Sequence, residues 1–219
     1  MSNRASDEPK PWNFLMSEYA YEHSKCGCAS DYLLPILREL LKVVPPGSVV
    51  ADAGCGNGSM LAALENSHWK MHGIEVSQSG LSQARTQYPQ FEFHFADMGR
   101  DDCILPMIGI CDVVISTEVV EHVFLPRVFA KNCWYLLKSG GILIISTPYH
   151  GYLKDLCLAL TNKLDAHFTA LWDYGHIKFW SKRTLTHLLE ETGFEVKQFH
   201  GAGRLPYLWK SMVLVATKR

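Results

Sequence analysis

Several features are scarce in this 219-residue sequence. No apolar run approaches the ~20 residues that a membrane-spanning helix needs. The first residues, MSNRASDEPKPW, carry charges of both signs and lack the apolar core of a secretory signal. With 21 Lys and Arg against 22 Asp and Glu, the formal net charge of −1 excludes nucleic-acid binding by bulk electrostatics. These absences predict a cytoplasmic protein with no transmembrane segment and no nucleic-acid partner.

Internal repeats and low-complexity segments are also missing. Hydrophobic residues make up 47% of the chain and charged residues 20%, which is ordinary for a packed core. We therefore expect a single domain over residues 1–219, with a flexible tail at 1–15. None of the seven cysteines forms a CxxC pair, so free buried thiols are expected, with a metal or redox pair at Cys26 and Cys28 as the alternative.

Short β-rich runs alternate with amphipathic helical stretches along the chain. We expect strands at 48–52, 71–76, 91–96, 111–116, 142–147, 194–199 and 208–217. We expect helices at 31–43, 59–66, 77–88, 125–138 and 181–192. This alternation predicts an α/β fold with a parallel sheet and helices on both faces, which binds ligands beyond the carboxyl ends of its strands. Residues 149–180 interrupt the pattern and predict an insertion that caps the substrate site.

A glycine-rich turn follows the first expected strand, in ADAGCGNG at residues 51–58. Gly54, Gly56 and Gly58 allow positive φ angles and the close approach of a ligand. Ser59 stands where a dinucleotide-binding fold has its third glycine, and no Gly-Lys-Ser/Thr of a P-loop follows. The alternative interpretation is a tight strand-to-helix turn without a ligand.

Acidic residues stand at the ends of the next two strands. Glu75 can accept two hydrogen bonds from ribose hydroxyls, although a solvated strand end is the alternative. Asp97 can accept an adenine amino hydrogen while Met98 packs on the ring. Three strand ends thus predict a backbone cradle, a ribose acceptor and an adenine acceptor.

These segments resemble the class I S-adenosylmethionine-dependent methyltransferases over residues 30–217. ADAGCGNG, IEVS, FADM and LLKSGGILIISTPY match the family's motifs in order and spacing. The resemblance implies a Rossmann-like, seven-stranded, mostly parallel sheet with an antiparallel last strand, and S-adenosylmethionine as the cofactor. It implies a cofactor site made of Asp52, Gly54, Gly56, Gly58, Glu75, Val76, Asp97, Met98 and Thr117.

The segment TEVVEHV follows the fourth expected strand. On a helical turn Glu118, Glu121 and His122 would share one face and converge, with His176 as a fourth ligand. Carboxylates and imidazoles suit Mg²⁺, Mn²⁺ or Zn²⁺, and such a cation would lower the pKa of a substrate hydroxyl. The alternative is that these side chains serve packing or positioning without a metal.

TEVVEHV and GHIKFWSKRTLTHLLEETGFEV together resemble the ubiquinone-biosynthesis O-methyltransferases. The resemblance implies methyl transfer to a hydroxyl oxygen of a small molecule, such as a quinol, a phenol, a sugar or a secondary metabolite. Small-RNA 2′-O-methyltransferases share the ExxEH pattern, so methylation of RNA ends is one alternative. A non-catalytic S-adenosylmethionine-binding module is the other.

Two histidines are candidates to remove the proton of a hydroxyl acceptor. His122 follows the fourth expected strand, and His150 follows the fifth, although a surface histidine is the alternative for His150. The insertion supplies aromatic walls for an acceptor pocket, or alternatively ordinary core. These aromatic residues are Tyr149, Tyr152, Phe168, Trp172, Tyr174 and Trp180. The N-terminal residues Tyr19, Tyr21 and His23 are expected to fold over the same opening.

Overall fold

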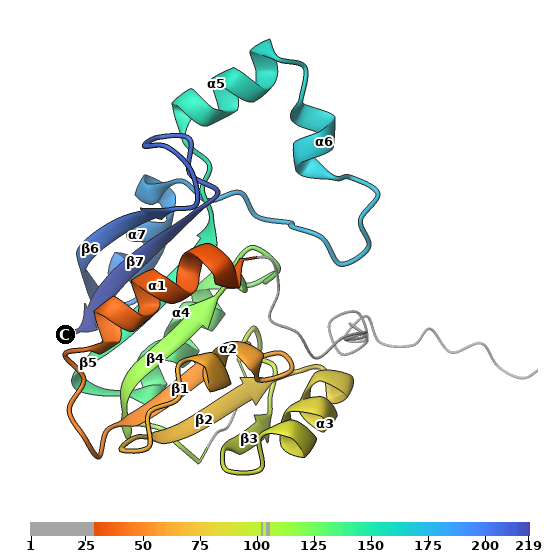
Figure 1. Ribbon diagram of the computed structural model, residues 1–219. Coiled ribbons are helices and arrows are strands. Elements are labelled where there is room, and N and C mark those ends of the chain that lie inside the picture. The colour runs from red at the N-terminus through yellow and green to blue at the C-terminus, as the bar shows by residue number, and fades with distance from the viewer. Residues whose placement is uncertain (1–28, 102, 104–105) are drawn as a thin grey trace, which may run out of the picture.

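The computed structural model describes residues 29–219 except 102 and 104–105, and it contains one seven-stranded sheet (Figure 1). The strands are β1 (Val49–Ala53), β2 (Lys70–Glu75), β3 (Glu92–Phe95), β4 (Cys111–Thr117), β5 (Leu137–Pro148), β6 (Phe194–Ala202) and β7 (Ser211–Lys218). The helices are α1 (Ser30–Leu41), α2 (Ser59–Ala63), α3 (Gln78–Gln87), α4 (Pro126–Leu136), α5 (Tyr152–Leu160), α6 (Leu164–Phe168) and α7 (Lys182–Glu191). The expected tail at 1–15, the N-terminal aromatic stretch and the pair Cys26 and Cys28 lie outside the described residues.

The strand order is β3-β2-β1-β4-β5-β7-β6. β1 pairs in parallel with both β2 and β4, so the order reverses between β1 and β4. β7 runs antiparallel to both of its neighbours, β5 and β6. This arrangement confirms the predicted fold, and it makes the carboxyl ends of β1 and β4 the switch point where such sheets bind ligands.

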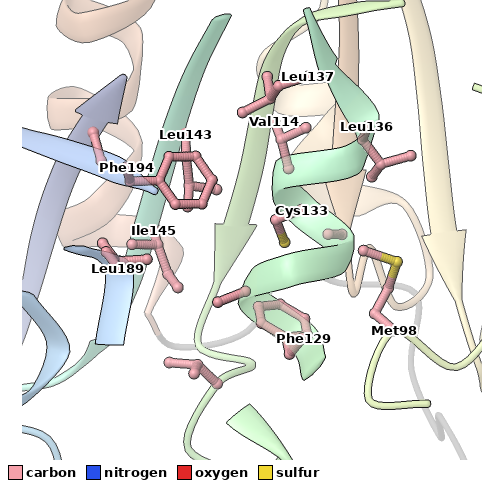
Figure 2. Packing of buried hydrophobic residues seen from close by; sticks show 14 of the residues in the cluster. Met98, Val114, Phe129, Cys133, Leu136, Leu137, Leu143, Ile145, Leu189 and Phe194 are labelled. Atoms are coloured by element: carbon pink, nitrogen blue, oxygen red, sulfur yellow. The ribbon is translucent and has the colours of Figure 1, made fainter. Parts of the chain in front are cut away.

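Two hydrophobic clusters cover the two faces of the sheet. On one face, Leu33 of α1, Leu61 of α2 and Leu81 of α3 pack against alternate strand residues. The other cluster is built around α4 and α7, and Figure 2 shows Phe129 and Cys133 of α4 within it. Side chains alternate between faces along each strand and both faces are covered, which is why β1 and β4 are buried at nearly every position.

Local signals in the sequence set several element ends. The Ser77 hydroxyl accepts a hydrogen bond from Gly80 N and begins α3, as predicted for a capping serine. β5 differs from the prediction, because it begins at Leu137 directly after α4 and includes Gly140, which has a φ of 76°. We expected a helix up to residue 138, whereas α4 ends at Leu136 and the buried Leu137 already pairs with β4.

The predicted insertion contains α5 and α6, which extend away from the sheet (Figure 1). Within the described part of the chain, no helix is long and apolar enough to cross a bilayer. The thiols of Cys55, Cys111 and Cys133 are buried and free, as predicted, whereas Cys157 of α5 is exposed.

Candidate functional site

The turn after β1 depends on two glycines for different reasons. Gly54 has a φ of 89°, and a Cβ there would lie 2.5 Å from a methyl group of Val119. Gly58 begins α2 at a φ of 78°, and a Cβ there would lie 3.1 Å from the rings of Tyr88 and Phe93. Gly54 therefore borders the loop after β4, whereas Gly58 allows α2 to pack closely on α3 and β3.

The Glu75 carboxylate at the end of β2 organises the surrounding backbone. Its Oε2 accepts from Gly56 N at 2.8 Å, and its Oε1 accepts from Val76 N at 2.9 Å and Ser77 N at 2.8 Å. A carboxylate has about four lone-pair positions, so one acceptor position remains for a ligand. Burial raises the pKa of Glu75, while these three backbone hydrogen bonds oppose the increase.

Asp52 lies deeper in the same region and is 1% exposed. Its Oδ1 has no hydrogen-bond partner among the described residues. Burial and the nearby Glu75 charge raise the pKa of Asp52 to about 7. The site thus contains a buried acid whose ionised form is stabilised only if a positive or hydrogen-bond-donating group comes close.

A cavity of about 230 Å³ opens at the carboxyl ends of β1, β2 and β4. Six of the nine predicted cofactor residues line it: Gly54, Glu75, Val76, Asp97, Met98 and Thr117. Asp52, Gly56 and Gly58 do not line it and support the turn from behind. The Asp97 Oδ1 accepts from Gly99 N at 2.8 Å, which fixes the carboxylate at the rim.

The segment after β4 is a turn without helical structure, so the expected helical face is absent. Glu118 has a left-handed backbone with a φ of 55°. Its carboxylate accepts from Ser146 Oγ at 2.8 Å and from Ser211 Oγ at 2.9 Å. Glu118 lines the cavity together with His122, but its carboxylate is not part of the cluster that Glu121 and His122 form.

Glu121, His122 and His176 do come together, and their potential ligand atoms lie within 4.8 Å of one another. Glu121 Oε2 accepts from Thr147 Oγ1 at 3.0 Å, while the buried Oε1 has no hydrogen-bond partner among the described residues and lies 4.0 Å from His176 Nε2. Burial and the charge of Glu118 raise the pKa of Glu121 well above its ordinary value. A buried carboxylate oxygen beside two imidazoles is a donor set that fits a divalent cation.

The tautomer of His122 follows from its partners. Its Nδ1 lies 3.0 Å from the carbonyl oxygen of Tyr174 and 3.3 Å from that of Gly175. Because a carbonyl can only accept, Nδ1 carries the proton and Nε2 has a free lone pair. Burial lowers the pKa of His122, so the imidazole is neutral at pH 7.

The part of the insertion that follows α6, residues 169–180, forms an arm that returns to the sheet. Further hydrogen bonds join this arm to the loop after β4. Ile177 N and Lys178 N donate to Glu121 O at 2.9 and 3.0 Å. This brings Trp172 and Tyr174 to the wall of the cavity. These are two of the six aromatic residues expected there.

The other four aromatic residues lie elsewhere. Tyr149 packs against Trp209, Phe168 stacks on His150, and Trp180 packs against the core. Tyr152 is 84% exposed. For Tyr149, Tyr152 and Trp180, packing or solvent exposure describes the side chain better than a ligand wall, whereas Phe168 lines the neighbouring pocket beside His150.

His150 lies in a neighbouring pocket and does not line the cavity beside Glu75. Its ring contacts the rings of Phe168 and Phe179, and its Nδ1 is 3.6 Å from Asp155 Oδ1. Burial, followed by the nearby Lys154 charge and two imidazoles, lowers the pKa of His150 to about 4. His176 lines this pocket as well and lies between it and His122.

Sequence reasoning did not identify several apolar residues that shape the cavity. Val119, Val123 and Phe129 line it without contributing a polar group. The only signal for Val119 was its place inside TEVVEHV, next to the residues singled out for their charge.

Comparison with known proteins identifies the chain's relatives. A methyltransferase domain model matches residues 27–198. A probable S-adenosylmethionine-dependent methyltransferase of Mycolicibacterium smegmatis is 27% identical over 161 residues, covering 72% of this chain and 57% of that protein. A ubiquinone biosynthesis O-methyltransferase of Caulobacter vibrioides is 31% identical over 135 residues, covering 58% and 49%. The chain thus spans about half the length of these relatives.

Solved structures show the same architecture. Magnesium protoporphyrin IX methyltransferase from Synechocystis, solved with bound SAH, superimposes with a TM-score of 0.64 at 20% identity over 85% of this chain and 82% of that one. At this identity the likeness supports the fold alone. The family model, however, matches well over half of the chain, and the chain belongs to the S-adenosylmethionine-dependent methyltransferase family.

Proposed function

We propose that the protein transfers a methyl group from S-adenosylmethionine to a hydroxyl oxygen of a small molecule. One observation carries the proposal: His122, with a free Nε2, lines the same cavity as Glu75 and Asp97. A neutral imidazole there can take the proton that a hydroxyl must lose on methylation. The ubiquinone biosynthesis O-methyltransferase among the relatives supports oxygen as the acceptor atom.

The residues around the cavity fit the cofactor. Glu75 has an acceptor position left for the ribose hydroxyls, and Asp97 lies at the rim beside Met98 for the adenine. The buried, unpartnered Oδ1 of Asp52 suits the positively charged methionine end of the cofactor. When bound, the cofactor supplies an activated methyl group, so the protein has to align the acceptor, exclude water and remove a proton.

We expect the acceptor to enter beside the insertion. Trp172 and Tyr174 offer flat apolar faces at the cavity, and His150 faces the adjoining pocket with Phe168. We therefore expect His150 to contact the distal part of an acceptor and His122 to act at the reacting hydroxyl. Aromatic faces also stabilise a nearby positive sulfonium charge.

The reaction is tested with S-adenosylmethionine and a panel of catechols, phenols and sugars, with products identified by mass spectrometry and by the NMR shift of the new methyl group. His122→Gln should lower kcat by about 10² or more, which is typical for loss of a general base, and should leave S-adenosylhomocysteine affinity within about threefold. The matched control is His187→Gln, because His187 is a 72% exposed histidine of α7. Methylation at carbon or nitrogen, or cofactor binding without turnover of any hydroxylated acceptor, would overturn the proposal.

We also propose that Glu121, His122 and His176 hold a divalent cation. Glu118 was part of the predicted set, but each of its carboxylate oxygens accepts from a serine hydroxyl and it lies outside the cluster of Glu121, His122 and His176, so we leave it out. A cation here would act as a Lewis acid toward the acceptor oxygen. In that case His122 Nε2 is a ligand and not the base.

Chelation separates these two roles of His122. If a cation is required, excess chelator should abolish turnover, Mg²⁺ or Mn²⁺ should restore it, and His176→Gln should raise the concentration of metal needed. Full turnover in excess chelator would remove the cation from the proposal and leave the imidazole as the base.

A further inference from the structure

We propose a second metal site, outside the residues that line the cavity, in which His72, Glu92 and His94 bind Zn²⁺ or a similar divalent metal ion at the edge of the sheet. His72 is on β2, and the other two residues are on β3, the edge strand of the described sheet. In the parallel pairing, His72 lies directly opposite Glu92, and His94 follows two residues later. Side chains alternate along a strand, so all three project from the same face.

The distances between the potential ligand atoms fit a tetrahedral ion. His72 Nδ1 lies 3.3 Å from His94 Nε2 and 3.6 Å from Glu92 Oε2. With Zn–N and Zn–O bonds of about 2.0–2.2 Å, two ligands of a tetrahedral zinc ion are about 3.3–3.5 Å apart. All three ligand atoms lie within 4.8 Å of one another, so little movement is needed to close the site.

A bound cation would replace the hydrogen bond that joins the two imidazoles. Two facing ring nitrogens repel each other unless one of them carries a proton or a cation bridges them. Burial lowers the pKa of both His72 and His94, so at pH 7 both rings are neutral and able to bind a metal.

Burial is graded across the site. The His72 side chain is 9% exposed and the Glu92 side chain is 74% exposed. An ion can therefore enter from solvent past Glu92 and complete its coordination with water. Imidazole and carboxylate without thiolate suit Zn²⁺, Co²⁺ or Ni²⁺ better than Ca²⁺.

An ion here would link β3 to the rest of the sheet. In the described sheet β3 pairs with β2 alone, and the chain after β3 leads to Asp97 and Met98 at the cavity. The expected consequence is a higher unfolding temperature when metal is bound, since binding to the native state stabilises it.

The test uses untagged protein and measures Zn²⁺ binding by calorimetry and Co²⁺ binding by the visible absorption of the bound ion. The variants are His94→Gln and Glu92→Gln at this site and His176→Gln at the other cluster. Both residues on β3 are at least partly exposed, so their replacement should preserve the fold, which circular dichroism checks. Binding that persists when both clusters are disrupted, for example at the exposed Cys157 thiol, is subtracted as background.

We expect His94→Gln to weaken one Zn²⁺ binding event at least tenfold. The part of the tetrahedral Co²⁺ absorption that comes from this site should disappear, and zinc should raise the Tm of the variant less than that of wild type. That event should persist in His176→Gln. Equal zinc binding in wild type and His94→Gln would overturn the proposal, as would loss of all specific binding in His176→Gln.

Discussion

Asp52 offers a sharp test of the electrostatics of the cofactor turn. The side chain is fully buried, and the causes that shift its pKa, burial and the Glu75 charge, act in the same direction. The unfolded chain releases the Asp52 proton near pH 3.8, whereas the folded protein retains it up to about pH 7. Stability is therefore lost as the pH rises through this window, and Asp52→Asn should remove that loss.

The size of the effect follows from the pKa shift. Each pKa unit corresponds to about 1.4 kcal/mol, so a shift from 3.8 to about 7 is worth at most about 4 kcal/mol. Near pH 4, only slightly above the unfolded-state pKa of 3.8, little of this stability has been lost, and wild type and variant should differ little. Above about pH 7 the variant should be the more stable protein by nearly the full amount.

Urea denaturation at several pH values gives the free energy of unfolding of both proteins. Asp112→Asn serves as a control with a pKa shift of the opposite sign. Partial burial raises the pKa of Asp112, but hydrogen bonds from Lys138 Nζ and Val49 N outweigh the effect of burial, so the pKa is lowered. Its difference from wild type should therefore have the opposite dependence on pH. A difference between Asp52→Asn and wild type that stays constant between about pH 4 and 8 would refute the reasoning.

Three further changes test the site and its support. Glu75→Ala should weaken S-adenosylhomocysteine binding at least tenfold in calorimetry, and unchanged affinity would remove the ribose assignment. Gly54→Ala should destabilise the protein more than Gly109→Ala, because both have positive φ but only the first places a Cβ 2.5 Å from a valine methyl group; equal losses in thermal unfolding would contradict this. Phe129→Ala should cost about 3–5 kcal/mol in urea unfolding, whereas Phe124→Ala, at a 63% exposed position, should cost far less; similar costs would refute the core assignment.

The sheet and the strand-end residues were predictable because they depend on local signals. Alternating runs set the strands, and parallel strands bring Gly54, Glu75 and Asp97 to one edge whatever the details of packing. The approach of His176 to His122 was also predicted, because both were expected in one ligand set.

The place of Glu118 could not be read from the sequence. The prediction assumed a helical turn, but Glu118 has a left-handed backbone conformation. Few residues other than glycine adopt this conformation, and no local sequence motif indicated it. One of its partners, Ser211, lies 93 residues away on β7. Tyr152 was misjudged for a related reason, because α5 projects away from the sheet and the sequence does not give its direction.

The contact between His122 and the carbonyls of Tyr174 and Gly175 links two events that are usually considered separately. These carbonyls belong to the arm that returns from α6, so if the arm moves outward to admit a ligand, Nδ1 loses the acceptors that hold its proton there. The ring is then free to exchange tautomers and has no defined basic nitrogen facing the cavity. If His122 is the base, as proposed above, proton removal has to wait until the arm is back in place, which would give the catalytic cycle a fixed order: entry, closure, deprotonation.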